Sequence, residues 1–125
     1  LADPRRDIKD TVNQIKRRRR FRPFAPAILE EFADKYFEGP MNKYMQFVAN
    51  AKHDYKSVTH VDGTARVQLV EKDCSSILRP ILEEWYELTG CPMLLNTSLN
   101  IKGQPIVDNW SDATEFEKEY NVKVF

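Results

Sequence analysis

An apolar run gives way to small polar side chains at Leu94-Leu95-Asn96-Thr97-Ser98-Leu99-Asn100. This pattern predicts a buried strand over residues 92–95 that delivers Asn, Thr and Ser side chains at its carboxyl end. Open α/β sheets bind ligands at the carboxyl ends of their strands, so the segment is a candidate site. Its neutral donors and acceptors suit a small polar ligand better than a metal ion. A strand end capped by local hydrogen bonds to the backbone explains the segment alone equally well.

Length and composition are typical of one globular domain. The chain has 125 residues, of which 42% are hydrophobic and 30% charged, and its formal net charge is zero. A neutral chain provides no general electrostatic attraction for nucleic acids or membranes, and no apolar run approaches the ~20 residues of a membrane span. Cys74 and Cys91 lack CxxC spacing, which favours free thiols in a reducing cytoplasm. We therefore expect a cytoplasmic protein without membrane or specific nucleic-acid partners.

The N-terminal third predicts two helices joined by an extended segment. Asp3-Pro4 is a favourable helix start, and an apolar stripe continues from there to about Arg17. The prolines of Phe21-Arg22-Pro23-Phe24-Ala25-Pro26 favour an extended path. Helical periodicity returns over residues 29–37, and Gly39-Pro40 ends it.

The middle of the chain predicts strands. Residues 44–48 have the composition of a strand, and Asp62-Gly63 is a strong turn signal between strands at 57–61 and 64–70. In the second arm of this expected hairpin, Arg66 lies on the face that borders solvent or a cleft.

The C-terminal half predicts two more helices around the apolar strand. The first covers about residues 77–88, with cap candidates at 73–76 and Gly90 as its C′ residue. The second covers residues 112–120, with Ser111 as its cap. Helices interleaved with strands and one hairpin indicate an α/β (α+β) fold with a mixed sheet in a single domain.

A basic run joins the two N-terminal segments. Lys16 is followed by Arg17-Arg18-Arg19-Arg20, and Arg22 lies between Phe21 and Pro23. The run has three interpretations: a solvated helix end, a nucleic-acid patch or a phosphate site. The rigid, apolar surroundings of Arg22 suit bidentate contact with a phosphate.

Common catalytic motifs are absent from the sequence. Without GxxxxGK[ST] or GxGxxG, a nucleotide would have to bind without a P-loop. Ser98 lacks the GxSxG elbow of a hydrolase nucleophile, so a hydrogen-bonding role is expected for it. His60 near Asp62 has no third partner in sequence reach and is expected to be structural rather than catalytic or metal-binding.

Several segments together resemble one family. They are Leu1-Ala2-Asp3-Pro4-Arg5, Asn13-Gln14-Ile15-Lys16, Phe21-Arg22-Pro23-Phe24-Ala25-Pro26, Thr59-His60-Val61-Asp62-Gly63-Thr64-Ala65-Arg66-Val67-Gln68 and Leu94-Leu95-Asn96-Thr97-Ser98-Leu99-Asn100. In this order they resemble the C-terminal domain of NodU/CmcH-type O-carbamoyltransferases, over about residues 1–108. The resemblance implies a YrdC-like domain: a twisted, mixed sheet with flanking helices.

The resemblance also implies an activity. Such domains form carbamoyl adenylate from carbamoyl phosphate and ATP with Mg²⁺, in a biosynthetic transferase. A separate N-terminal domain, related to actin-like ATPases and holding a metal expected to be iron, passes the carbamoyl group to a hydroxyl acceptor. That domain would act in cis or as a separate chain.

The site residues are implied in the same way. Cations would offset the repulsion between the two polyanionic substrates, and neutral side chains would hold the carbamoyl or phosphate oxygens. The expected catalytic and cofactor-binding residues are Lys16, Arg22, Arg66, Asn96, Thr97 and Ser98.

The end of the chain departs from the family pattern. We expect similarity to fade after Asp108, with a diverged tail beyond Trp110. We also expect the chain to be a fragment, or half of a split enzyme, that lacks the N-terminal transfer domain. The favoured interpretation is therefore that the chain is part of a carbamoyltransferase. The alternatives are a non-catalytic YrdC-like module that binds nucleotide or RNA, and a purely structural remnant.

Overall fold

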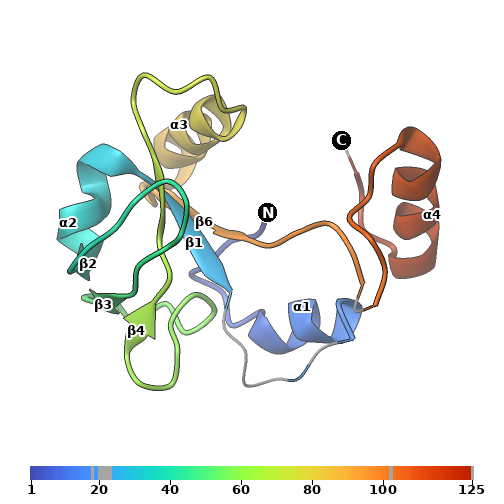
Figure 1. Cartoon of the computed structure of the whole chain (residues 1–125), viewed down its shortest axis with the longest axis horizontal. Coiled ribbons are helices and arrows are strands. Elements are labelled where there is room, and N and C mark those ends of the chain that lie inside the picture. The colour runs from blue at the N-terminus through green and yellow to red at the C-terminus, as the bar shows by residue number, and fades with distance from the viewer. Residues whose placement is uncertain (18, 20–23, 102, 125) are drawn as a thin grey trace.

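Short strands and helices alternate along the chain. The computed structural model describes residues 1–17, 19, 24–101 and 103–124. Its elements, in chain order, are α1 (Lys9–Ile15), β1 (Ala25–Leu29), the 3-10 turn η1 (Glu30–Phe32), α2 (Ala33–Tyr36), β2 (Phe37–Glu38), β3 (Ala49–Ala51), β4 (Thr64–Ala65), β5 (Gln68–Val70), α3 (Leu78–Thr89), β6 (Met93–Asn96) and α4 (Trp110–Tyr120). Two small sheets with helices around them confirm the expected α/β (α+β) class (Figure 1).

β1 is the middle strand of the main sheet, whose order is β5-β1-β6. It runs parallel to β5 and antiparallel to β6, so the sheet is mixed, as predicted. A bridge between Ala2 and Leu95 places the first residues of the chain beside β6. β6 confirms the predicted apolar strand, with both ends one residue later than expected.

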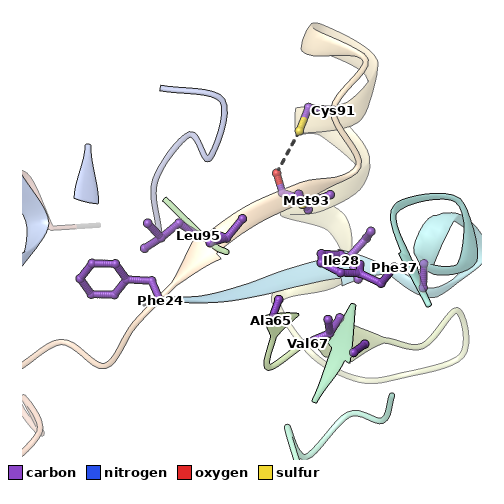
Figure 2. Packing of buried hydrophobic residues seen from close by; sticks show 11 residues of the cluster. Phe24, Ile28, Phe37, Ala65, Val67, Cys91, Met93 and Leu95 are labelled. Carbon is purple, nitrogen blue, oxygen red and sulfur yellow. Dashed lines mark hydrogen bonds between the residues drawn. The ribbon is translucent and has the colours of Figure 1, made fainter. Parts of the chain in front are cut away.

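Different elements cover the two faces of the main sheet. On one face, Ile28, Met93 and Leu95 form a cluster with residues of the second sheet, which has the order β2-β3-β4 (Figure 2). Ile8, the N-cap residue of α1, and Val12 within the helix pack against the same cluster. Because the apolar side of α1 is fixed there, its carboxyl end is held close to the main sheet.

α3 covers the opposite face. Leu82 of α3 packs against Ala27, Leu29 and Leu94 of the sheet. Successive side chains of a strand point to opposite faces, so the residues that alternate with Ile28 along β1 lie under α3.

The first helix starts later than predicted. α1 begins at Lys9, because the residues before it form other hydrogen bonds. Ala2 pairs with Leu95, and the Asp3 carboxylate accepts hydrogen bonds from the backbone N and the guanidinium of Arg5. These contacts form a turn at the expected helix start and lower the pKa of Asp3.

The predicted hairpin is only partly correct. The turn forms, since Gly63 has φ +82 and its N donates to His60 O at 3.0 Å. However, β4 pairs with β3 rather than with residues 57–61. The buried Ser57 is tied to the segment before α1 instead, because its Oγ donates to Arg6 O at 2.7 Å. The expected strand 64–70 is divided between two sheets, as β4 and β5.

The predicted strand at 44–48 is also wrong. The Asn42 side chain accepts hydrogen bonds from Tyr44 N and Gln46 N, which makes a turn there, and Met45 has φ +55. A side chain that bonds the following backbone competes with strand pairing. The strand therefore begins only at Ala49.

The later helices are close to expectation. α3 starts at Leu78 with Pro80 in its first turn, and Gly90, at φ +68, donates its N–H to Tyr86 O. α4 begins earlier than predicted, because Asn109 rather than Ser111 caps it and accepts from Asp112 N at 3.0 Å. In Figure 1, α4 lies at one end of the molecule, beyond α1. Within the described ranges, no helix has both the length and the apolar character needed to cross a membrane.

Candidate functional site

A buried lysine at the end of α1 is the first part of the site. Lys16 is the C-cap of α1 and only 7% exposed. Its ammonium donates to the backbone oxygen of Ser98, to Ser98 Oγ at 3.1 Å and to Asn100 Oδ1 at 2.8 Å. These three acceptors are neutral oxygens, and they orient the ammonium. The structure thus brings together Lys16 and Ser98, two of the predicted site residues.

The polar segment after β6 is held by its own hydrogen bonds. Ser98 Oγ donates to Asn100 Oδ1 at 2.6 Å, and Asn100 Nδ2 donates to Gln104 O at 3.1 Å. Leu99 O accepts from Val107 N at 2.9 Å. These hydrogen bonds give the segment a defined path beside Lys16.

Asn96 belongs to a different part of the site. It is the last residue of β6, it pairs with Ala25 of β1, and its Nδ2 donates to Gln68 Oε1 at 2.7 Å. By strand alternation this side chain shares the α3 face of the sheet, whereas α1 covers the other face. Thr97 is half-buried and lies in the chain between Asn96 and Ser98, which contacts Lys16.

Arg66 lines a pocket of about 400 Å³ beside the start of β1. It is exposed and lies between β4 and β5. In the same pocket, Thr64 donates from its hydroxyl at 2.6 Å and from its N at 3.0 Å to Asp62 Oδ1, which lowers the pKa of that carboxyl. The pocket therefore contains both the Arg66 cation and the Asp62 carboxylate, whose lowered pKa favours its ionised form.

The three parts are linked to one another through the chain near the amino end of β1. Ala25 lines the Arg66 pocket and is also the cross-strand partner of Asn96. Ser98, which contacts Lys16, follows Asn96 by two positions. Arg22, the remaining predicted cation, lies outside the described residues.

Two residues of the site were missed by sequence reasoning. Asn100 stands in the quoted polar segment, and its spacing of two positions from Ser98 could have identified it. Gln68 ends another quoted segment, but its pairing with Asn96 depends on the strand order β5-β1-β6. No local pattern predicts that order.

The side chains present fit a magnesium-bound polyphosphate. The exposed Arg66 can contact phosphate oxygens, the Lys16 ammonium can act on them through its charge, and the Asp62 carboxylate is an oxygen ligand of the type that Mg²⁺ accepts. Mg²⁺ that binds with ATP keeps several water and phosphate ligands and needs few from the protein. The described residues contain no group of three or more His, Cys, Asp or Glu side chains that could hold a metal ion without such help.

Comparison with known proteins identifies the family. Nodulation protein NolNO of Sinorhizobium fredii is 42% identical over 123 residues, which cover 90% of this chain and 18% of that protein. Nodulation protein NolO of Bradyrhizobium diazoefficiens is 41% identical, over 90% of this chain and 22% of that protein. Nodulation protein U of Rhizobium tropici is 35% identical, over 87% of this chain and 20% of that protein. The chain spans about a fifth of the length of these curated relatives.

The family model described as Carbamoyltransferase C-terminus matches residues 1–125. The expected fading of similarity after Asp108 is therefore wrong, and α4 is part of the family pattern. With its whole length matched, the chain belongs to the carbamoyltransferase C-terminus family.

Proposed function

We propose that this chain forms carbamoyl adenylate from carbamoyl phosphate and ATP, and that another part of the full-length protein passes the carbamoyl group to a hydroxyl acceptor. The observation that carries the proposal is the Lys16 ammonium, oriented by Ser98 and Asn100 at the carboxyl end of β6. Family membership supports the transfer of a carbamoyl group.

Adenylate formation requires two polyanions to approach each other. Their repulsion must be offset by cations that are already in position before the reaction. Lys16 supplies one such cation, and Arg66 supplies a second in the pocket beside β1. Mg²⁺ bound to the ATP phosphates would add charge neutralisation for the leaving pyrophosphate.

The atoms balance when one water takes part. Water adds to the carbamoyl carbon, the bond from that carbon to the phosphate oxygen breaks, and phosphate and carbamate result. A carbamate oxygen then attacks the α-phosphorus of ATP, and the bond to the bridging oxygen breaks to release pyrophosphate. Phosphate, pyrophosphate and carbamoyl adenylate therefore form in equal amounts. Ser98 acts in this scheme as a hydrogen-bonding residue, since its Oγ donates to the neutral Asn100 Oδ1 and accepts from the Lys16 ammonium, which in this protonated form cannot take its proton.

The test is exchange of labelled pyrophosphate into ATP by the full-length protein, with and without carbamoyl phosphate. We expect exchange only when carbamoyl phosphate is present. Lys16→Met should lower its rate by roughly 10²–10³-fold, the scale of one lost transition-state donor. Arg22→Ala and Arg66→Ala should weaken ATP binding measured by calorimetry.

Arg17→Ala is the matched control. Arg17 follows Lys16 directly, but its side chain is exposed and pairs with Glu119 Oε1 at 3.0 Å. Its removal should leave the exchange rate unchanged. If the parent protein shows no exchange but binds RNA below micromolar concentrations at physiological salt, the chain is a non-catalytic RNA-binding module and the proposal is wrong.

A further inference from the structure

Two carboxamides are joined across the middle strand of the main sheet. Gln68 lies in β5 and Asn96 in β6, and both strands pair with β1 between them. The hydrogen bond from Asn96 Nδ2 to Gln68 Oε1, 2.7 Å long, therefore spans β1. Such a bridge needs both side chains on one face of the sheet and small residues beneath them.

The register provides both conditions. Gln68 pairs with Ala27 and Asn96 pairs with Ala25. Residues two apart in a strand share a face, so the two carboxamides and the two alanines lie on the same side of the sheet. Alanine has the smallest side chain of the residues that form a more stable strand than glycine. Its methyl group leaves room above β1 for the hydrogen bond between Asn96 and Gln68.

The bridge fixes the orientation of the Asn96 carboxamide. One N–H of Asn96 is directed to Gln68, so Oδ1 is turned away from it. This oxygen forms no hydrogen bond within the described residues and is not buried. A fixed, accessible acceptor at the carboxyl end of β6 can recognise an N–H donor on a ligand.

We propose that Gln68 is a positioning residue that holds Asn96 Oδ1 to accept an N–H of the carbamoyl amine, and so selects carbamoyl substrates over acyl substrates of the same shape. This inference rests on the proposed function. Acetyl phosphate has a methyl group where carbamoyl phosphate has the amine, so it leaves the oriented oxygen unpaired. A site built to bond a polar group rejects an isostere that lacks it far more strongly than an apolar pocket can.

The test compares the two acyl phosphates in the pyrophosphate exchange assay with the full-length protein. The parent protein should use acetyl phosphate at least roughly 100-fold less efficiently, judged by kcat/KM. Gln68→Met keeps the length of the side chain but removes the acceptor. It should lower kcat/KM for carbamoyl phosphate about tenfold and leave the value for acetyl phosphate and the KM for ATP unchanged.

Gln68→Glu is the matched control, because a carboxylate still accepts from Asn96 Nδ2. It should keep the parent's preference for carbamoyl phosphate. If Gln68→Met leaves the ratio of kcat/KM for carbamoyl phosphate to kcat/KM for acetyl phosphate unchanged, the inference is overturned. This holds whether both values fall equally or neither falls, and the proposed function would still stand.

The parent protein alone provides a second measurement, which holds even if Gln68→Met does not fold. Comparable use of the two acyl phosphates by the parent would overturn the role of Asn96 while carbamoyl adenylate formation remained. Absence of any carbamoyl-phosphate-dependent exchange would overturn the proposed function and this inference together.

Discussion

Lys16 and Arg79 are equally buried cations with different surroundings, each 7% exposed. Arg79 donates to both carboxylate oxygens of Glu31, at 2.9 and 2.7 Å, and to Glu83 Oε1 at 2.8 Å. These carboxylates raise the pKa of Arg79, Glu31 most of all. Lys16 is oriented instead by the neutral oxygens of Ser98 and Asn100. Arg79 is thus bound by carboxylates, whereas the described acceptors of Lys16 are neutral oxygens.

The two cations also lie at opposite ends of β1. Arg79 contacts Glu31 just after β1 and donates to Val70 O at the end of β5, so it ties the turn η1, β5 and α3 together. Lys16 contacts the segment that leaves β6 next to the start of β1. One end of the strand is thus closed by a structural ion cluster, and the other holds the candidate site. This contrast predicts that substitutions at the two ends affect different properties.

Ser98→Ala should have the largest effect, on activity. The change removes a hydroxyl that contacts both Lys16 and Asn100 but opens little volume. We expect carbamoyl-phosphate-dependent pyrophosphate release to fall by roughly 10²–10³-fold, with little change in the melting temperature. Ser111→Ala, on the exposed start of α4, is the control.

Two results would contradict this expectation. Full activity in Ser98→Ala would reduce the segment to a structural strand end. A carbamoyl-serine adduct detected by mass spectrometry in the parent would show that Ser98 is a nucleophile, which the contacts of its Oγ do not favour.

Arg79→Met should act on stability instead. It removes hydrogen bonds to two carboxylates and leaves the Val70 carbonyl without its guanidinium donor. The Glu31 and Glu83 side chains are 41% and 52% exposed, so water can solvate them after the change. We therefore expect a loss of about 2 kcal/mol, below the 3–5 kcal/mol typical of a fully buried pair.

Urea unfolding of the parent and Arg79→Met measures this loss, with the exposed Arg17→Met as the control for removal of one charge. The folded fraction of Arg79→Met should retain the parent's kcat/KM. A loss of activity as large as that in Ser98→Ala would mean that the two ends of β1 do not have separate roles.

The contrast also explains which parts of the fold could be predicted from sequence. α3 was predicted correctly because its signals are local: an apolar stripe, a first-turn Pro80 and Gly90 as the C′ residue. The hairpin failed because Ser57 bonds Arg6 O, which lies 51 positions away. No window of local sequence contains both residues, so the loss of the expected strand could not be read from the pattern.

The residues of the candidate site also differ in whether the sequence could predict them. Family resemblance identified Lys16 and Ser98, and the structure joins them across 82 positions. Residue chemistry alone left Lys16 as one cation among several in a basic run. Gln68 could not be assigned a role, because its contact with Asn96 depends on which strand lies between them.

The smallest predicted effect is the pH dependence of the stability that the Glu31–Arg79 pair contributes at the carboxyl end of β1. Arg79 holds the pKa of Glu31 below its ordinary value, chiefly through the side-chain hydrogen bonds. A carboxyl group whose pKa is lower in the folded state stabilises the fold above the unfolded-state pKa of about 4.3, and this contribution is lost as the pH falls through the folded-state pKa. Glu31→Gln should therefore be less stable than the parent at pH 7, and the difference should shrink below about pH 4.3.

Because the Glu31 carboxylate is partly solvated, we expect a difference at pH 7 of only about 0.5–1 kcal/mol. Urea unfolding of both proteins at pH 7, 5 and 3.5 measures it, and Glu84→Gln, an exposed carboxylate of α3, controls for net charge. A difference between parent and Glu31→Gln that stays constant to pH 3.5 would mean that the two side chains interact by packing rather than by charge. Arg79 would then stabilise its end of β1 by packing, and the contrast with the neutral acceptors of Lys16 would not be one of charge pairing.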